Sequence, residues 1–360
     1  MHLRWASSDR ERADPRRSAR NRPASALFGS HAASAICTTA AVATGCSGAQ
    51  SALDVRGPGA QRIADIWWPM LAAGCAVFLL VVALLAYVAF RRKARDSTAT
   101  AETVRSAKRW IIAGGVVLPV VVLVPLFIAS VSTLQSLMHD DGDYMTIHVT
   151  GRQWWWQVRY KGTAIAGDVI AANEIHVPAG RRVRVEVATA DVIHSLWIPN
   201  LQGKTDLVPG RVNVMWIEAN RPGVSRAQCA EYCGTQHARM ALPVVAEPQA
   251  AFDAWLARER LPASPPADPA ARMGSAVFIS AGCGTCHTIR GSTAGGTRGP
   301  DLTHFASRRT IAAGTLSNTR ANLTAWLADP QAVKPGNKMP RVPLTSQQVS
   351  ATVSYLETLR

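Results

Sequence analysis

Residues 229–240 read Cys-Ala-Glu-Tyr-Cys-Gly-Thr-Gln-His-Ala-Arg-Met. Two thiols (Cys229 and Cys233), an imidazole (His237) and a thioether (Met240) therefore fall within one short segment. Thiolate and thioether sulfurs are soft ligands that suit copper, and imidazole also binds copper well. Because two thiolates can bridge a pair of metal ions, the segment predicts a copper site. A disulfide is one alternative, and a structural zinc site, which does not need Met240, is another.

A second histidine and a set of short strands surround this segment. His194 lies upstream in Asp-Val-Ile-His-Ser, residues 191–195, and a cupredoxin-type barrel would bring such a histidine beside the Cys/His/Met loop. Residues 181–187 alternate between charged and apolar side chains, as a half-buried strand does. Further strands are expected at residues 144–150, 155–160 and 212–218. Short strands at this spacing predict a Greek-key β sandwich of the cupredoxin type.

Two long apolar runs precede the sandwich. Residues 66–90 and 110–130 carry no charged side chain, and each run is long enough to cross a bilayer as a helix. Pro119 and Pro125 would break a buried helix of a soluble domain but are tolerated in a membrane-spanning one. Residues 91–109 between the runs carry seven basic and two acidic residues. The positive-inside rule places this loop in the cytoplasm and the chain after about Leu134 on the other side of the membrane.

The first 46 residues are expected to be a targeting region. An arginine-rich start is followed by the weakly apolar residues 24–42 and by Ala-Thr-Gly-Cys, ending at Cys46. The small residues before Cys46 resemble a bacterial lipoprotein cleavage site, and an unprocessed tail is the alternative. The formal charge of the 360-residue chain is +15, but its basic residues lie in three separate blocks, none within a known nucleic-acid-binding motif. The sequence therefore argues against a nucleic-acid partner.

The C-terminal part carries a second cofactor motif. Residues 257–270 are rich in proline and predict a semi-rigid linker. Cys283-Gly-Thr-Cys286-His287 follows, and the pattern C-x-x-C-H marks covalent attachment of a c-type haem, with the histidine as an axial iron ligand. Helices are expected at residues 272–281 and 345–359. The layout is similar to that of a small, all-α cytochrome c, with Met339 as the sixth iron ligand; Met/His ligation raises the haem potential.

The copper segment and its upstream histidine resemble the dinuclear copper (CuA) site of subunit II of haem–copper cytochrome c oxidases, over about residues 60–250. The resemblance implies that Cys229 and Cys233 bridge two copper ions and that His194 and His237 bind one copper each. It further implies that Met240 is a weak ligand of one copper and that the backbone carbonyl of Glu231 binds the other. The Glu231 side chain would reach a magnesium ion at the interface with subunit I.

The resemblance also assigns roles around the two sites. Trp154, the first aromatic residue of Gly-Arg-Gln-Trp-Trp-Trp (residues 151–156), occupies the position at which the family receives electrons from cytochrome c. In cytochromes c the carbonyl corresponding to that of Pro300 orients the ring N–H of the haem histidine, here His287. One position departs from the family, because Ala107 stands where a glutamate often opens a proton pathway into subunit I.

Together these features predict a multi-domain membrane protein. Its parts would be a targeting region (1–46), a transmembrane helix hairpin (60–133), a cupredoxin CuA domain (134–256), a linker (257–270) and a cytochrome c domain (271–360). The resemblance implies the electron-entry subunit of a proton-pumping oxidase that reduces dioxygen to water. It would pass electrons from haem c to CuA and on to subunit I in a bacterial cytoplasmic membrane, with both cofactor domains in the periplasm.

Partners and alternatives follow from the same reading. Subunits I and III and an external cytochrome c or another periplasmic donor are the expected partners. A tethered haem domain could dock through its basic surface on an acidic patch of the copper domain formed by Asp140, Asp141, Asp143, Asp168, Asp191 and Asp206. An electron-transfer subunit of a nitric oxide or nitrous oxide reductase is one alternative. A quinol-oxidase subunit II is another, although that class lacks the copper ligands.

Overall fold

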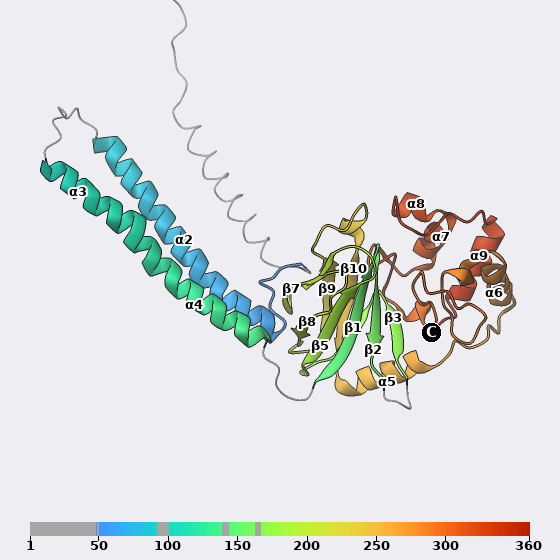
Figure 1. The fold of residues 1–360 in the computed structure, drawn as a ribbon. Helices are drawn as coiled ribbons and strands as arrows, with labels where there is room; N and C mark the ends of the chain where they lie inside the picture. Colours follow the sequence, from blue (N-terminus) through green and yellow to red (C-terminus); the bar gives the residue numbers. More distant parts are fainter. Residues whose placement is uncertain (1–47, 49, 92–100, 139–143, 163–166) are drawn as a thin grey trace, which may run out of the picture. The chain divides into compact units, whose positions relative to one another are not determined.

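The computed structural model describes residue 48 and residues 50–91, 101–138, 144–162 and 167–360 (Figure 1). The expected targeting region with Cys46, and the acidic residues Asp140, Asp141 and Asp143, lie outside these described residues.

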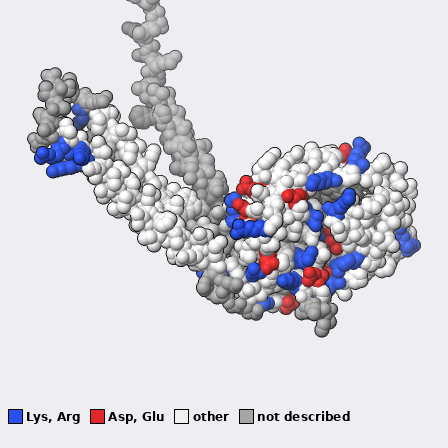
Figure 2. Space-filling model, in the orientation of Figure 1, with Lys and Arg blue, Asp and Glu red and all other residues white. Residues whose placement is uncertain are grey.

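Two long apolar helices form the first described part. Helix α2 spans Pro58–Arg91, and a continuous helical run comprises α3 (Ala101–Ile112), the π-helical turn η1 (Ala113–Val117) and α4 (Leu118–Met138). Both are long and apolar enough to cross a membrane. Their surface is almost free of charged side chains, and Lys and Arg gather at the end that carries α3 (Figure 2). The helices are longer than the apolar runs because polar residues at either end continue them.

The β domain is a sandwich of two five-stranded sheets, which confirms the cupredoxin-type fold predicted from the sequence. One sheet has the order β3-β2-β1-β5-β8 and the other the order β4-β10-β9-β6-β7. The ten strands in chain order are β1 (Met145–Arg152), β2 (Trp155–Tyr160), β3 (Val169–Ala172), β4 (Ile175–Pro178), β5 (Val183–Thr189), β6 (His194–Ile198), β7 (Gln202–Leu207), β8 (Asn213–Ile217), β9 (Gly223–Cys229) and β10 (Ala241–Glu247).

Alternating side chains build the core of the sandwich. In β5, Val183, Val185 and Val187 are fully buried, whereas the charged residues between them are half-buried. Because successive side chains of a strand point to opposite faces, this pattern directs one face of the sheet inward. Trp156 lies in the same core and is fully buried.

Helix α5 (Gln249–Arg260) closes one end of the sandwich and leads toward the next domain (Figure 1). Its buried Trp255 packs edge-on against Tyr160 and stacks on His176, with ring centroids 5.0 and 4.1 Å apart. The helix continues to Arg260 and thus includes the first residues of the predicted linker. Pro262 lacks a backbone N–H and restricts the residue before it, so the helix ends here.

The C-terminal domain is helical and has a core of its own. Its helices are α6 (Pro269–Ser280), η3 (Cys283–Thr285), η4 (Phe305–Ser307), α7 (Arg320–Ala328), α8 (Pro330–Val333) and α9 (Ser346–Leu356). Asp268 caps α6, and Thr345 forms a capping box with Gln348 at the start of α9. A two-stranded ribbon of β11 (Thr310–Ile311) and β12 (Leu316–Ser317) is an addition to the predicted all-α domain.

Candidate metal centre and haem site

The loop between β9 and β10 carries five of the six residues predicted to hold copper. We call residues 229–240 the copper loop. Cys229 ends β9, the short helix η2 (His237–Arg239) carries His237, and Met240 precedes β10. His194 begins the neighbouring strand β6, where Leu196 pairs with Cys229. The pairing of β6 with β9 therefore brings the distant histidine to the loop.

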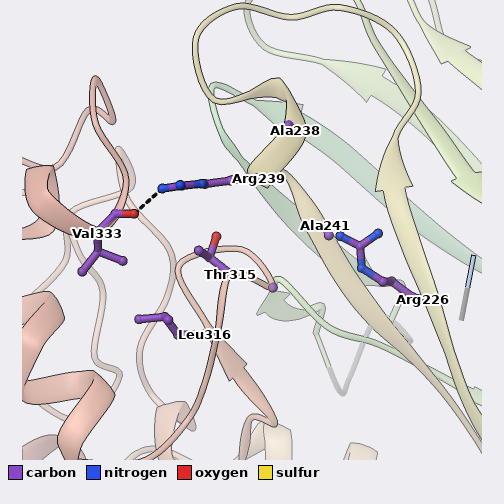
Figure 3. Close-up of a pocket in the computed structure, with 8 residues that line it drawn as sticks. Arg226, Ala238, Arg239, Ala241, Thr315, Leu316 and Val333 are labelled. Carbon is purple, nitrogen blue, oxygen red and sulfur yellow. Dashed lines mark hydrogen bonds between the residues drawn. The ribbon is translucent and has the colours of Figure 1, made fainter. Parts of the chain in front are cut away.

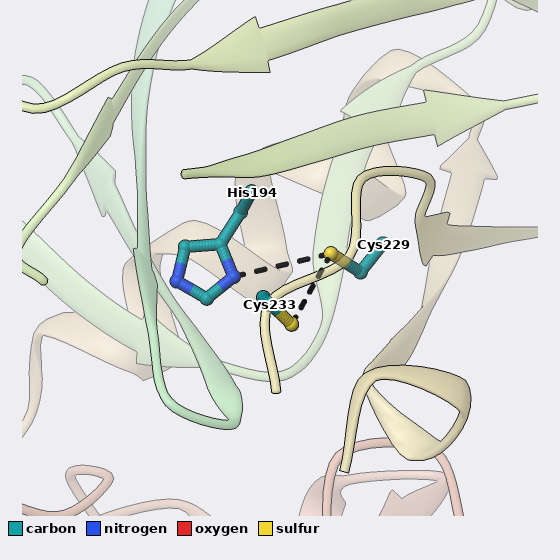
Figure 4. Close-up of side chains that lie close together, drawn as sticks. All are labelled: His194, Cys229 and Cys233. Atoms are coloured by element: carbon teal, nitrogen blue, oxygen red, sulfur yellow. Dashed lines mark hydrogen bonds between the residues drawn. The ribbon is translucent and has the colours of Figure 1, made fainter. Parts of the chain in front are cut away.

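The predicted ligand atoms converge around the two thiols, and Figure 4 shows the two thiols with the His194 ring beside them. The Sγ atoms of Cys229 and Cys233 lie 3.7 Å apart, and both thiols are free. The Nδ1 atom of His194 lies 3.9 Å from Cys229 Sγ, and that of His237 lies 3.8 Å from Cys233 Sγ. The Sδ atom of Met240 lies 3.9 Å from Cys233 Sγ.

The last predicted ligand atom is the backbone carbonyl oxygen of Glu231, which lies 3.2 Å from Cys229 Sγ. Its side chain is directed elsewhere: the carboxylate is 44% exposed and pairs with Lys204 at 3.3 Å. The six donors are two thiols, two imidazoles, a thioether and a carbonyl. This soft, nitrogen- and sulfur-rich set fits copper.

Hydrogen bonding fixes the orientation of the His194 ring. Its Nε2–H donates to the Asp191 carboxylate at 2.8 Å, which leaves the Nδ1 lone pair facing Cys229. The ring is fully buried and lies against Gly151, where a Cβ atom would come within 2.8 Å of it. Burial opposes ionisation of Asp191, but hydrogen bonds from His194, Gln153 and Val192 together lower its pKa.

Each of the two thiols changes the acidity of the other. A hydrogen bond from Cys233 is the main cause that lowers the pKa of Cys229, and the same contact raises the pKa of Cys233. The pair therefore gives up its first proton readily, which suits thiols that must ionise to bind a metal.

Trp154 lies directly over the copper loop. Its Nε1–H donates to the backbone carbonyl of Cys233 at 3.0 Å, and the Gln153 side chain donates to the same oxygen at 2.9 Å. The indole is half-buried and lies against Gly234, where a Cβ atom would come within 3.0 Å of the ring. Trp154, the predicted electron-entry residue, thus contacts the backbone of Cys233, a predicted bridging residue, and of Gly234 after it.

The C-terminal domain arranges the predicted haem residues in a comparable way. The Nδ1–H of His287 donates to the Pro300 carbonyl at 2.8 Å, so Nε2 is the nitrogen available to iron. Burial lowers the pKa of His287, which favours the neutral imidazole that ligation requires. Cys283 and Met339 both pack against the apolar core of this domain, and Cys286 carries a free thiol. These residues fit a covalently attached haem with Met/His ligation.

Three residues next to these sites were not singled out from the sequence. Gln153 contacts the copper loop, Gln236 lies within it, and Lys334 precedes Met339 in the cytochrome c domain. Lys334 is only 3% exposed, and burial lowers its pKa to about 7. A lone lysine or glutamine carries no sequence signal for such a position, because its burial depends on tertiary contacts alone.

Comparison with known proteins gives two family matches. The family described as "Cytochrome C oxidase subunit II, periplasmic domain" matches residues 145–248, and the cytochrome c family matches residues 271–360. Cytochrome c oxidase subunit 2 of Alkalihalophilus pseudofirmus is 34% identical over 328 residues, which cover 88% of this chain and 93% of that protein. Its counterpart in Bacillus sp. strain PS3 is 32% identical over 290 residues, covering 75% and 79%.

A solved structure is also similar in sequence. The periplasmic domain of subunit II of cytochrome oxidase from Bradyrhizobium japonicum is 31% identical, with a TM-score of 0.32. The match covers 34% of this chain and 97% of that one.

Proposed function

The chain belongs to the cytochrome c oxidase subunit II family, and from this premise we propose that it is the electron-entry subunit of its oxidase. It carries a cytochrome c domain in addition to the copper domain. In the proposal, the chain passes electrons from its cytochrome c domain to its copper domain and on to subunit I, where dioxygen is reduced to water with proton pumping. When bound, a dinuclear copper centre and a haem supply the one-electron chemistry.

The convergence of four further donor atoms on the Cys229–Cys233 thiol pair carries this proposal. Cys229 and Cys233 would bridge two copper ions, His194 and His237 would bind one each, and the other two ligands would be Met240 and the Glu231 carbonyl. Neither a zinc site nor a disulfide would need a thioether and a carbonyl at these positions. The Glu231 carboxylate is exposed enough for a magnesium ion shared with subunit I.

In the second domain, Cys283 and Cys286 would attach the haem, and His287 and Met339 would ligate its iron. The hydrogen bond from His287 to Pro300 supports this assignment, because it holds the ring in the tautomer that an iron ligand needs. Trp154 would connect the copper loop with the donor side.

The membrane arrangement is part of the proposal. Residues 60–133 would span the cytoplasmic membrane twice, and residues 134–256 and 271–360 would form the periplasmic copper and cytochrome c domains. The cluster of basic residues at the α3 end of the hairpin, seen in Figure 2, supports a cytoplasmic loop. Residues 1–46 would be a targeting region processed at Cys46. Subunits I and III and a periplasmic electron donor would be the partners.

Electron paramagnetic resonance of the oxidised, copper- and haem-loaded chain tests the copper assignment. We expect hyperfine splitting from one unpaired electron shared by two equivalent coppers. Cys233→Ser removes one bridging sulfur and should abolish the shared-electron signal while leaving the haem spectrum intact.

The matched control is Cys75→Ser, which alters an exposed thiol on helix α2 and should leave both signals unchanged. A mononuclear copper signal in the unaltered, haem-loaded chain would refute the dinuclear assignment.

A further inference from the structure

Two loops of the cytochrome c domain lie against the copper loop. The first, which we call the Met339 loop, comprises the short helix α8 (Pro330–Val333) and the residues that follow it up to Pro340. The side-chain amide of Gln236 donates to the Pro335 carbonyl. The guanidinium of Arg239 donates to the Val333 carbonyl, as Figure 3 shows. These two donors flank His237 in sequence, so the loop that carries one predicted cofactor ligand is bonded to the loop that carries another.

The second loop comprises residues 312–314. The backbone N–H of Ala241, directly after Met240, donates to the Ala313 carbonyl at 3.0 Å. Ala312, Ala313 and Gly314 all have positive φ angles, of 53°, 56° and 74°. A left-handed backbone conformation costs conformational free energy at an alanine, and it persists only where the surrounding structure holds it. Here Ala313 is buried with 1% exposure, which is a sign of a formed interface.

Lys334 joins the two domains at the centre of this contact. Its Nζ atom donates to the Trp154 carbonyl of the copper domain at 2.9 Å and to the Ala312 carbonyl of the cytochrome c domain at 3.2 Å. Only one carbonyl of each domain is involved, and the amino group lies in a buried position. A hydrogen bond in such a position is expensive to leave unmade, because its acceptors lose access to water as well.

We propose that Lys334 is the positioning residue of an electron-transfer contact built into the chain, fastening the cytochrome c domain so that the Met339 loop lies on the copper loop. The proposal rests on the proposed function, since it concerns the step between the two cofactor domains. Electron transfer depends steeply on distance, so a residue that holds this contact controls the rate without binding either cofactor.

The contact differs from the acidic docking patch expected from the sequence. Among the described aspartates of that patch, Asp168 pairs with Arg159 and Asp206 with Lys204, each within the copper domain itself. Asp191 alone faces the cytochrome c domain, 3.9 Å from Lys338, whose side chain is 60% exposed. Exposed pairs of this kind contribute little. The interface between the copper domain and the cytochrome c domain, which we call the seam, is therefore held mainly by hydrogen bonds to backbone carbonyls. Most of the donors are buried, so we expect the seam to resist salt.

Chemical footprinting tests the burial of Lys334 without any substitution. In the unaltered, cofactor-loaded oxidase, brief treatment with acetic anhydride followed by mass spectrometry gives an acetylation rate for each lysine. Lys338, on the same loop, is the internal reference. Only the unprotonated amine reacts, and burial lowers the pKa of Lys334, so each rate is divided by the unprotonated fraction obtained from its pH dependence. We expect the corrected rate of Lys334 to be at least tenfold below that of Lys338, at low and at high salt. Equal corrected rates would overturn the proposal.

Substitution tests the effect on electron transfer. Lys334→Leu removes both hydrogen bonds, and Arg341→Leu removes a cation from a 69% exposed side chain of the same domain as the matched control. After flash photoreduction of the cytochrome c domain, we expect electron transfer to the copper domain to slow at least tenfold in Lys334→Leu and to stay within twofold of the original rate in Arg341→Leu. An unchanged rate in Lys334→Leu would overturn the proposal.

Two further measurements distinguish a positioning role of Lys334 from misfolding of the variant and from failure of the proposed function. Hydrogen exchange at the Ala241 amide, which donates across the seam, should accelerate at least tenfold in Lys334→Leu only. The copper and haem spectra should be the same in both variants, because Lys334 binds neither cofactor. Absence of the shared-electron copper signal from the unaltered chain would instead refute the proposed function. Footprinting and hydrogen exchange would still decide whether Lys334 holds the two domains together.

Discussion

His194 is held from two directions. Asp191 accepts the Nε2–H of the ring at 2.8 Å and also accepts the backbone N–H groups of Gln153 and Val192, at 2.7 and 2.8 Å. One carboxylate thus joins the histidine to the segment that carries Trp154. Carboxylates behind metal-bound histidines fix the ring and raise its basicity, and their loss weakens metal binding.

Asp191→Asn should therefore lower copper affinity by about 10–100-fold. The amide keeps the size of the side chain but loses the charge and one acceptor oxygen, so the His194 ring is held less firmly. Chelator competition on the haem-loaded chain measures the affinity. Asp168→Asn is the control, because Asp168 pairs only loosely with Arg159, at 3.7 Å on the exposed surface of the same domain. Equal affinities in the two variants would contradict the role of Asp191.

At the scale of elements, helices α6 and α9 cross closely in the cytochrome c domain. Gly274 lies at the crossing, where a Cβ atom would come within 1.9 Å of the Ala351 carbonyl oxygen. Phe278 and Tyr355 pack edge-on nearby, with ring centroids 6.0 Å apart. Since helix α6 leads directly into the Cys283–His287 segment, this crossing sets the frame for the predicted haem attachment.

Gly274→Ala should lower the melting temperature of the cytochrome c domain. Alanine favours a helix over glycine by about 1 kcal/mol, whereas overpacking costs about 1–3 kcal/mol. The obstacle is a backbone atom that cannot move aside, so the upper part of that range applies and the packing cost prevails. Thermal scans followed by haem absorbance measure the change. Gly295→Ala, where a Cβ atom meets nothing within 4 Å, should leave the melting temperature unaltered; a gain in Gly274→Ala would show that the helices can separate.

The strands and spans show how far local pattern predicts these elements. The strand expected at residues 155–160 coincides with β2, and the alternating residues 181–187 overlap with β5. Periodicity locates such elements because burial alternates with it. Boundaries between domains are less well specified: the linker was expected at residues 257–270, but helix α5 continues to Arg260, since nothing before Pro262 stops it.

The candidate site divides in the same way. The copper loop and the C-x-x-C-H segment could be predicted from the spacing of their ligand residues, because a cofactor needs ligands of given types at given intervals. The contacts of Lys334, Gln236 and Ala313 gave no such signal, since they join residues that are far apart in the sequence through backbone carbonyls, which every residue carries. The seam between the two domains could therefore be found only in three dimensions.

At the scale of the whole molecule, a second group of contacts joins α5 and the copper domain to the cytochrome c domain. The Arg290 guanidinium donates to the carbonyl oxygens of Glu259 and Arg260 at 2.5 and 2.9 Å. The Glu174 carboxylate accepts the backbone N–H of Arg309 at 3.0 Å, and the Leu261 carbonyl lies 3.0 Å from His304 Nε2. The predicted linker is therefore bonded to the domain that follows it rather than acting as a free tether.

Glu259 makes this part of the seam sensitive to pH. Its side chain is buried, and burial raises its pKa although His304 and Arg308 act in the opposite direction. The folded state thus binds the proton more tightly than the unfolded state. The resulting stability is fully present below the unfolded-state pKa of about 4.3 and is lost as pH rises through the folded-state pKa.

Glu259→Gln should remove this loss, because the amide stays neutral at every pH. We expect the melting temperature of the full chain to exceed that of the unaltered chain at pH 7, with a difference that shrinks toward zero near pH 4. Asp253→Asn, on the exposed face of the same helix, should show no such pH-dependent gain. A lower melting temperature for Glu259→Gln at pH 7 would mean that attraction to Arg308 outweighs burial, and that the seam is held by an ion pair rather than strained by a buried charge.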